Sequence, residues 1–256
     1  MGRRVKANGT ILRTDPFSDV ILNPNFTRSY GYTIEPPTHT GVQATYAFCS
    51  AVSATVAVTD TYGPRINERA FPARAESYKT YMASVLFTAP TNWEVLAGST
   101  LAGCVMNGFN STSPSSTVPA DQTSWYIGGT VNTPVTGLKV GVAYDYAGVS
   151  GQPLTADQSG YANAIGLYVS YQVTEKMALF ARGEYATSNV RSTFLANKIF
   201  ETTATLQYDL WKNVLSRLEF RWDHSADGSS PFGGTETGAG TLHNSYILLA
   251  DIAYKF

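Results

Sequence analysis

Apolar and polar residues alternate one by one through a series of short segments that begins at Thr40 and continues to Phe256. A period of two predicts β-strands, because successive side chains of a strand point to opposite faces of a sheet. Turn-forming Gly, Pro, Asn and Ser residues separate the alternating segments. We therefore expect residues 39–256 to form a meander of hairpins, after an irregular segment of residues 1–38 that several prolines interrupt.

The clearest alternation lies in the last strand-like stretch, which ends at Phe256. Counted back from that residue, every second position is apolar or aromatic, while the intervening positions are mixed and carry Asp251 and Lys255. On the apolar face, Tyr246 stands at one end and Tyr254 at the other, with aliphatic residues between them. This arrangement is typical of a strand that crosses a bilayer, since aromatic rings settle at the two interfaces. The apolar last strand of a soluble β-protein is the alternative.

The connections between the predicted strands alternate strictly in length. The short ones are residues 49–51, 89–92, 133–137, 174–176 and 211–213. The long ones are residues 60–77, 104–122, 148–159, 188–197 and 225–242. Bacterial outer-membrane barrels have short periplasmic turns and longer extracellular loops. The pattern therefore predicts a membrane barrel with its C-terminus in the periplasm, whereas a soluble sandwich has no need for this asymmetry.

We expect an all-β fold, in which residues 1–256 form one domain, an antiparallel up-and-down transmembrane β-barrel. From Thr40 onward the alternation gives about eleven strands, whereas single-chain bacterial barrels usually have an even number. One interpretation is that residues 1–20, with apolar Val5, Ala7, Ile11 and Leu12, supply a poor further strand and bring the total to about twelve. The other is that the chain is the C-terminal part of a larger barrel of about 16 strands. We favour the second interpretation.

The composition excludes several classes of protein. A net charge of −1 and a charged fraction of 14% give no support for nucleic-acid binding or for a polybasic membrane anchor. No apolar run approaches the ~18 residues that a membrane-spanning helix needs. The predicted strands place the two cysteines, Cys49 and Cys104, at opposite ends of the barrel wall. Because a disulfide needs Cα atoms within ~7 Å of each other, we expect no disulfide.

Charged residues alternate with apolar residues on the last predicted strands, and their side chains are expected to face inward. A charge at bilayer depth costs several kcal/mol when it faces lipid, so these side chains need a wet or paired interior. Acidic and basic residues are mixed, which suggests paired charges rather than a ring of one sign. We interpret them either as structural ion pairs or as residues along a solute pathway. The predicted pore-lining residues are Arg182, Glu184, Glu201, Asp209, Arg217, Glu219, Arg221, Asp223, Asp251 and Lys255.

Two segments outside the strands bear on the interior of the barrel. Residues 23–30 are interpreted as an ordered loop whose Arg28, Phe26 and Tyr30 are available for contacts inside the lumen; a plain surface loop is the alternative. The long connection 104–122 is expected to stay out of the lumen. Since no internal plug domain is indicated, we expect an interior open to solutes.

Signals for catalysis are weak. His39, His224 and His243 fall near the predicted extracellular strand ends, but no metal-ligand spacing links them, so we interpret them as loop residues. The sequence contains no Gly-x-Ser-x-Gly elbow, no phosphate-binding loop and no dinucleotide fingerprint. We therefore expect no catalytic residues, no metal site and no cofactor, and a protein that is not an enzyme.

Several stretches of the chain resemble a known family, the outer-membrane β-barrel porins described as OmpL-like, beta-barrel porin type 2. The stretches are Asn25-Phe26-Thr27-Arg28-Ser29-Tyr30, Pro37-Thr38-His39-Thr40-Gly41-Val42, Val214-Leu215-Ser216-Arg217-Leu218-Glu219-Phe220-Arg221-Trp222-Asp223-His224-Ser225 and the terminal Tyr254-Lys255-Phe256. Members of that family are longer and have upstream strands, which agrees with a larger barrel. The resemblance implies a general porin without established catalytic residues. It also implies that the last strand, ending in Phe256, is read by the barrel-assembly machinery.

The sequence therefore predicts a passive channel in the bacterial outer membrane for small hydrophilic solutes or ions. The expected partners are outer-membrane lipid, the barrel-assembly machinery and the solutes themselves; no nucleic acid is expected. A homo-oligomer is compatible with the sequence, although no feature shows one. A structural or partner-binding outer-membrane barrel without an open pore is the alternative, and lumen width, which grows with strand number, separates the two. An outer-membrane enzyme is a further alternative and would need a nucleophile and a base near the extracellular rim.

Overall fold

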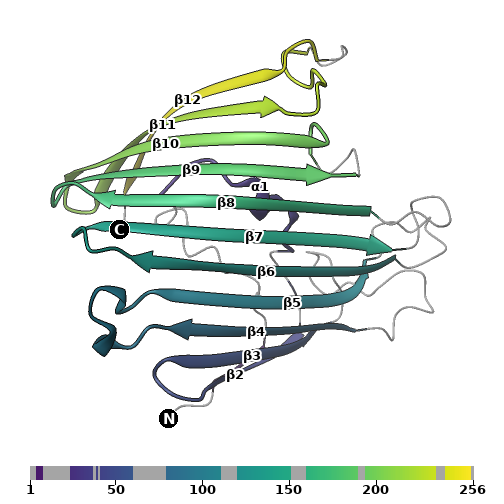
Figure 1. Ribbon diagram of the computed structural model, residues 1–256, viewed down its shortest axis with the longest axis vertical. Coiled ribbons are helices and arrows are strands. Elements are labelled where there is room, and N and C mark those ends of the chain that lie inside the picture. Colours follow the sequence, from purple (N-terminus) through teal and green to yellow (C-terminus); the bar gives the residue numbers. More distant parts are fainter. Residues whose placement is uncertain are drawn as a thin grey trace.

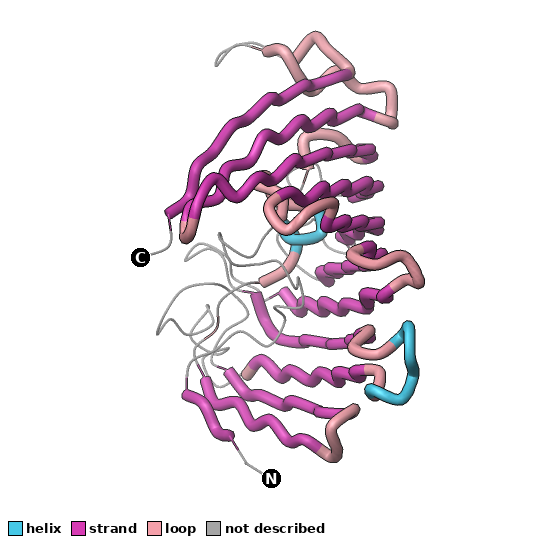
Figure 2. The backbone as a smooth tube through the Cα atoms, turned by 90° about the vertical axis from the view of Figure 1, so that its left-hand side faces the viewer, coloured by secondary structure: helices cyan, strands magenta, loops and turns pink. Residues whose placement is uncertain are grey.

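The computed structural model shows a single antiparallel sheet of twelve strands in which neighbours in sequence are neighbours in space. It describes residues 4–7, 24–36, 39, 41–59, 79–110, 120–150, 160–189, 194–234 and 240–254. The sheet is strongly curved, so that it has a concave and a convex face (Figures 1 and 2). The predicted all-β, up-and-down meander is therefore confirmed. Within the described residues the sheet is not closed into a ring, since β12 is paired with β11 and no pairing with β1 is seen.

The strands are β1 (Arg4–Ala7), β2 (Gly41–Ala47), β3 (Val52–Thr59), β4 (Thr80–Thr88), β5 (Thr100–Asn110), β6 (Ala120–Asn132), β7 (Leu138–Ser150), β8 (Gly160–Gln172), β9 (Met177–Ser188), β10 (Lys198–Trp211), β11 (Val214–Ser225) and β12 (Asn244–Tyr254). Among the described residues, two short helices accompany them, α1 (Tyr30–Ile34) and the 3-10 helix η2 (Thr91–Leu96). Strands β5 to β12 contain 11 to 14 residues each. A tilted strand needs about 9–11 residues to cross the hydrocarbon core of a membrane, so these strands are long enough.

The convex face of the sheet is apolar and open to its surroundings. On β12, Leu248 is 70% exposed and Ile252 is 71% exposed, and aliphatic and aromatic residues continue this surface across the other strands. A soluble monomer rarely exposes so large a continuous apolar area, whereas a membrane barrel turns such a face toward lipid. The alternation read from the sequence therefore assigns the two faces correctly. Among the residues described, neither helix has the length and apolar character of a membrane-spanning helix.

The connection between β4 and β5 differs from the sequence prediction. A tight turn at residues 89–92 was expected, followed by a strand that begins at Trp93; instead η2 occupies residues 91–96 and β5 begins at Thr100. Backbone hydrogen bonds join Trp93 N to Pro90 O (3.0 Å) and Ala97 N to Glu94 O (3.0 Å). The Asn132 amide adds a hydrogen bond to Ala97 O (2.6 Å) from the neighbouring hairpin. The strand predicted from the alternation of Trp93 and Val95 does not form, because 3-10 hydrogen bonds within the connection satisfy the backbone groups there.

The predicted loop 104–122 is also wrong in its limits. Strand β5 continues to Asn110, and β6 begins at Ala120, with the two strands paired along this whole length. Their polar residues resemble a loop in sequence. Gln122 and Ser124 are buried on the concave side, whereas Asn107 bonds to Asp121 and Thr123 on the opposite, exposed face. Cys104 is consequently buried in the middle of β5 and not at an end of the wall, while Cys49 is exposed in the β2–β3 turn, and both thiols are free.

The other predicted hairpins are confirmed, with turns at residues 49–51, 133–137, 174–176 and 211–213 lying between paired strands. Twelve strands agree with the lower of the two predicted strand numbers. Several other predictions fall outside the described residues: parts of the long connections, the apolar Ile11 and Leu12, and both Lys255 and Phe256.

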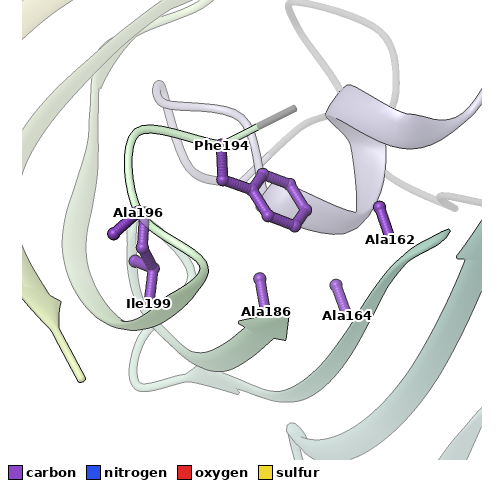
Figure 3. Close-up of a cluster of buried hydrophobic side chains, with 6 residues drawn as sticks. All are labelled: Ala162, Ala164, Ala186, Phe194, Ala196 and Ile199. Carbon is purple, nitrogen blue, oxygen red and sulfur yellow. The ribbon is translucent and has the colours of Figure 1, made fainter. Parts of the chain in front are cut away.

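Small inward-facing residues make room for α1 on the concave face. Ala162, Ala164 and Ala186 are buried side by side on β8 and β9, and the Phe194 ring lies beside their methyl groups (Figure 3). Tyr30 of α1 packs on this cluster, and its ring meets that of Phe194 edge-on at 5.5 Å. Because alanine leaves a hollow where a larger side chain would stand, the helix approaches the sheet closely at this point.

Candidate functional site: the concave face and its inserted segment

Residues 24–34 lie across the concave face of the sheet, where α1 contacts β7, β8 and β9 (Figure 2). The helix begins after Ser29, whose hydroxyl accepts a hydrogen bond from Tyr32 N at 3.0 Å. We call residues 24–34 the inserted segment. Its backbone is mostly irregular, so its amide and carbonyl groups need partners when they are enclosed by a barrel.

Two glutamates of the sheet bind backbone amides of the inserted segment. Glu219 on β11 accepts hydrogen bonds from Phe26 N (2.5 Å) and Thr27 N (2.9 Å). Glu184 on β9 accepts hydrogen bonds from Tyr30 N (2.8 Å) and Gly31 N (3.4 Å). A carboxylate that accepts from backbone amides forms charge-assisted hydrogen bonds, which are stronger than neutral ones. The segment is therefore held at two points along its length.

Two arginines bind the carbonyl oxygens of the same segment. Arg182 on β9 donates to Thr27 O at 2.9 Å, and Arg221 on β11 donates to Arg28 O at 2.7 Å. The hydroxyl of Tyr30 donates to Asp223 at 2.8 Å. Acidic side chains thus accept from backbone amides, and basic side chains donate to backbone carbonyls. The mixture of acidic and basic residues seen in the sequence therefore provides partners for both kinds of backbone group in the inserted segment.

The same arginines also form ion pairs within the sheet. Arg182 lies 3.0 Å from Glu201 and 3.5 Å from Glu184, and Arg221 lies 2.8 Å from Asp223. Buried charges are costly unless they are paired and hydrogen-bonded, and here both conditions are met. We call the set the charge ladder; its members are Arg182, Glu184, Glu201, Arg217, Glu219, Arg221, Asp223 and Asp251.

Most of the predicted pore-lining residues lie together in this ladder. Glu201, Glu219 and Glu184 are 0%, 1% and 2% exposed, because the inserted segment covers them. Arg217 and Asp251 form a further ion pair of 2.9 Å between β11 and β12. Asp209 stands apart near the β10–β11 turn, where it accepts a hydrogen bond from Gln207 (3.2 Å), and Lys255 lies outside the described residues. The assignment of all these residues as pore-lining stays a prediction.

The inserted segment occupies part of the concave face, and whether the interior is open to solutes stays a prediction. The alternative in which residues 23–30 contact the interior is the one that the structure supports for the described residues 24–30. The sequence carried one signal for this contact: alanines at inward positions of adjacent strands, beside buried charges, leave space for another part of the chain.

A cavity of about 490 Å³ lies on the other half of the concave face, between the inserted segment and strands β2 to β8. Its wall carries many hydroxyl groups, from Ser29, Thr45, Ser53, Thr55, Ser84, Thr100, Tyr126, Thr130 and Tyr168. The charged residues recorded in its lining are Glu35, directly after α1, and Asp145 on β7. Sequence reasoning missed this site, although Ser and Thr at alternate positions of β2 to β4 signal a polar inward face.

Glycines beside the cavity let tyrosine rings lie flat against its wall. A Cβ atom at Gly128 would meet the ring of Tyr126, and one at Gly166 would lie 2.8 Å from the ring of Tyr168. The rings therefore occupy the space above glycine and do not project across the lumen. Because a larger residue at either glycine would push its ring outward, these pairs help to keep the cavity open.

The histidines do not converge on a site. His39 is buried and bonds to Pro36 O (3.1 Å), His224 bonds to Asn244 (2.9 Å), and His243 bonds to Ser229 O (2.6 Å). Within the described ranges, no group of three or more His, Cys, Asp or Glu side chains is arranged to hold a metal ion. One serine hydroxyl does lie near a histidine, since Ser230 Oγ is 3.4 Å from Nδ1 of His243 in the connection before β12.

Comparison with solved structures finds porins. An anion-selective porin from Comamonas acidovorans is similar with a TM-score of 0.64 at 9% identity, covering 85% of this chain and 59% of that porin. The outer-membrane protein OmpT of Vibrio cholerae is similar with a TM-score of 0.60 at 15% identity, covering 99% of this chain and 77% of OmpT. At such identities the likeness concerns the fold alone. The chain spans less than two thirds of the Comamonas porin.

The sequence was also compared with protein families and with curated proteins. No curated protein matches it. Residues 19–256 match the family described as "Putative beta-barrel porin-2, OmpL-like", which covers nearly the whole chain, including the inserted segment and every strand from β2 onward. The protein therefore belongs to this family of OmpL-like β-barrel porins.

Proposed function

We propose that the protein forms a porin-type channel in the bacterial outer membrane, through which small hydrophilic solutes or ions diffuse passively along the hydroxyl-lined half of the concave face. The observation that carries this proposal is the cavity of about 490 Å³ between the inserted segment and β2 to β8. Hydroxyl groups replace part of a solute's hydration shell without binding it tightly, which suits entry and exit from both sides. The family membership and the porin fold support the same function.

The charged half of the concave face is a weaker candidate for the pathway. The central side chains of the charge ladder are almost fully buried and bond to the inserted segment. Breaking a buried ion pair leaves an uncompensated charge, so these groups do not exchange partners readily with a passing solute. The ladder thus acts as the anchor of the segment, and the segment narrows the lumen to its hydroxyl-lined half.

The orientation follows from the lengths of the connections. Short turns face the periplasm and long loops face the outside in outer-membrane barrels, which puts the C-terminus in the periplasm. The convex face contacts outer-membrane lipid, and the last strand is the element that the barrel-assembly machinery would recognise. A homo-oligomer fits this family of folds, since one form of OmpT of Vibrio cholerae is described as a trimer. That assembly is a property of OmpT and is proposed for this chain only by likeness.

Introduced cysteines are modified with a thiol reagent while single-channel conductance is measured in planar bilayers. This experiment tests both whether the protein conducts and where the solute pathway runs. A Cys49→Ser background removes the exposed thiol and leaves the buried Cys104. Thr130→Cys then places a thiol in the cavity wall, and Thr205→Cys, at an inward position that is only 2% exposed, serves as the matched control. We expect a charged thiol reagent to lower the single-channel conductance of the Thr130→Cys protein alone.

The outcomes distinguish the alternatives. Block of the Thr205→Cys protein but not of the Thr130→Cys protein would move the pathway to the charged half. If neither folded variant nor the background conducts, with folding verified by heat-dependent gel mobility, the channel proposal fails and a structural or partner-binding barrel takes its place.

A further inference from the structure

We infer that the cavity on the concave face binds saccharides, through a strip of apolar residues that is flanked by two rows of hydroxyl groups. The inference rests on the proposed channel function and adds the chemical class of the solute. A sugar ring carries hydroxyl groups around its edge and C–H groups on its two faces. A site that holds such a ring therefore combines apolar contacts with a few placed hydrogen-bonding groups.

The apolar strip crosses four neighbouring strands at one level of the sheet. Its members lie opposite one another in the paired registers and all line the cavity: Leu86 on β4, Ala102 on β5, Gly128 on β6 and Ala143 on β7. Leu86 is 42% exposed although it lies on the concave face. An apolar side chain that is open to water is stabilised when an apolar surface covers it, and the C–H face of a sugar provides such a surface.

Hydroxyl groups border the strip on both sides. The row toward the long connections contains Thr55 and Ser84, which lie opposite each other on β3 and β4. The row toward the short turns contains Thr100 and Thr130, which lie opposite each other on β5 and β6. Four residues of strand separate the two rows, a distance of about 13 Å. One sugar ring, together with its hydroxyl groups, fits across this width.

Three of these four hydroxyl groups are available to a solute. Thr55 Oγ1 lies 3.0 Å from Oγ1 of Thr45 on β2, so this pair already shares a hydrogen bond. The side chains of Ser84, Thr100 and Thr130 form no hydrogen bond with another residue in the part of the chain that the structure describes, and all three are partly exposed. Because a hydroxyl both donates and accepts, it pairs with a sugar hydroxyl in either sense.

An aromatic ring adjoins the far end of the strip. Tyr168 on β8 continues the second row beyond Gly141, and its ring lies flat against Gly166, which is opposite Ala143. The flat ring thus extends the apolar surface from β7 to β8 without crossing the lumen. Aromatic rings offer a large apolar face together with a polar tip, which suits a solute that has both kinds of surface.

Charged groups of both signs surround the cavity. Glu35 and Asp145 belong to its lining, Lys139 lies two residues from Gly141, and Arg28 belongs to the inserted segment. The inference therefore rests on the strip and the hydroxyl rows and not on a net charge. Its test needs an uncharged sugar as the probe, so that attraction to these charges does not contribute.

Block of single channels by an added sugar provides this test. Maltotriose is added to one side of a planar bilayer that holds the wild-type protein in potassium chloride, and the fall in ion current gives the half-blocking concentration. A polyethylene glycol of equal hydrodynamic size lacks sugar rings and serves as the control for simple exclusion of ions from the lumen. We expect maltotriose to reach half block at a lower concentration than the polymer.

Two variants assign the block to the strip and to the rows. Leu86→Asn keeps the size of the side chain but removes its apolar character, and should raise the half-blocking concentration of maltotriose about fivefold. The double variant Ser84→Ala and Thr130→Ala removes one hydroxyl from each row and should raise it about tenfold, since each lost hydrogen bond contributes about threefold. Ser170→Ala is the matched control, because Ser170 lies on the same face of β8 outside the cavity lining.

Each result has a distinct meaning. A conducting wild-type channel that maltotriose does not block, or blocks no better than the polymer, overturns the inference and leaves the channel itself intact. Equal half-blocking concentrations in Leu86→Asn, the double variant and Ser170→Ala also overturn it, because the sugar would then bind elsewhere. Absence of conductance in the folded wild-type protein would instead overturn the proposed function. Heat-dependent gel mobility verifies folding, and Leu86→Asn, at an exposed position, decides the test if the double variant does not fold.

Discussion

At the scale of single residues, Gly31 determines how closely α1 approaches the sheet. A Cβ atom at this position would meet the Asp145 carboxylate, whose Cγ atom lies 3.2 Å from the same point. Gly31 is buried, and its amide also bonds to Glu184, so the helix cannot move away without losing that contact. Glycine is therefore required for the approach itself and not for a special backbone conformation.

We expect Gly31→Ala to loosen the inserted segment and to lower the free energy of unfolding by about 1–3 kcal/mol, the usual cost of overpacking a filled site. The measurement is the rate of trypsin cleavage after Arg28 in the folded protein, which should rise. Gly183→Ala is the matched control, because a Cβ there would lie 4.0 Å from its nearest recorded neighbour, Glu201 O. Equal cleavage rates for the Gly31→Ala and wild-type proteins would contradict the prediction.

Tyr30 gives the inserted segment a dependence on alkaline pH. Burial, and then the negative charge of Asp223, raises the pKa of the Tyr30 hydroxyl above its usual range. Because the folded pKa exceeds the unfolded value of about 10, the stabilisation is fully present below pH 10 and is lost as pH rises toward the folded pKa.

We expect Tyr30→Phe to lower the free energy of unfolding by about 0.5–1.5 kcal/mol at neutral pH, the net value of one hydrogen bond. The variant should also lose less stability than wild type when the pH is raised above 10. Urea unfolding in lipid vesicles at a series of pH values measures both effects. Tyr32→Phe, in the same helix, is the control, and parallel alkaline curves for wild type and Tyr30→Phe would refute the assignment.

At the scale of elements, the charge ladder holds an irregular segment that has few backbone bonds of its own. Glu184 and Glu219 each accept from two consecutive amides, and the arginines bind the carbonyls between them. This arrangement replaces the water that would otherwise solvate the segment. The inserted segment is thus docked by charged groups from Phe26 to Gly31 and by the Phe194 cluster at α1.

We expect the double variant Glu184→Gln and Glu219→Gln to release the segment, because a neutral amide forms weaker hydrogen bonds to backbone amides and leaves the arginines underpaired. The single-channel conductance should rise as the lumen widens. Asp251→Asn is the matched control: it breaks the ion pair with Arg217 in the same ladder and leaves Glu184 and Glu219 unchanged. Unchanged conductance in a correctly folded double variant would show that the segment does not restrict the pathway.

At the scale of the whole molecule, the two faces of the sheet belong to different environments. The apolar convex face fits lipid, and the concave face carries the ladder, the inserted segment and the cavity. Adjacent residues of β12 report the difference directly, since Leu248 is on the convex face and Leu249 is opposite Glu219 on the concave face.

We expect Leu248→Arg to destabilise the protein in lipid vesicles by about 2–4 kcal/mol, the cost of an arginine near the bilayer midplane. Leu249→Arg should cost less, because its side chain enters the acidic interior. The measurement is the urea unfolding midpoint of each variant, which should be lower for Leu248→Arg than for Leu249→Arg. If Leu248→Arg proves the milder change, the convex face is not the lipid-facing one.

The amino-acid sequence alone determined the strands, their faces and the order of their hairpins. A period of two is a local property, and each turn lies beside the strands that it joins, so both can be read along the chain. The inward direction of Arg182, Glu219 and Arg221 followed in the same way. Local reading failed where polar residues continue a pair of strands, as in β5 and β6, and where 3-10 bonds replaced a strand at η2.

Only the tertiary structure decided what these side chains contact. Phe26 N and Glu219 are 193 residues apart in sequence and bond directly, and no local pattern encodes such a meeting. The cavity likewise exists because the inserted segment covers one half of the concave face and leaves the other half uncovered. The reason is physical: alternation fixes which way a side chain points, whereas its partner depends on how distant strands curve around the same interior.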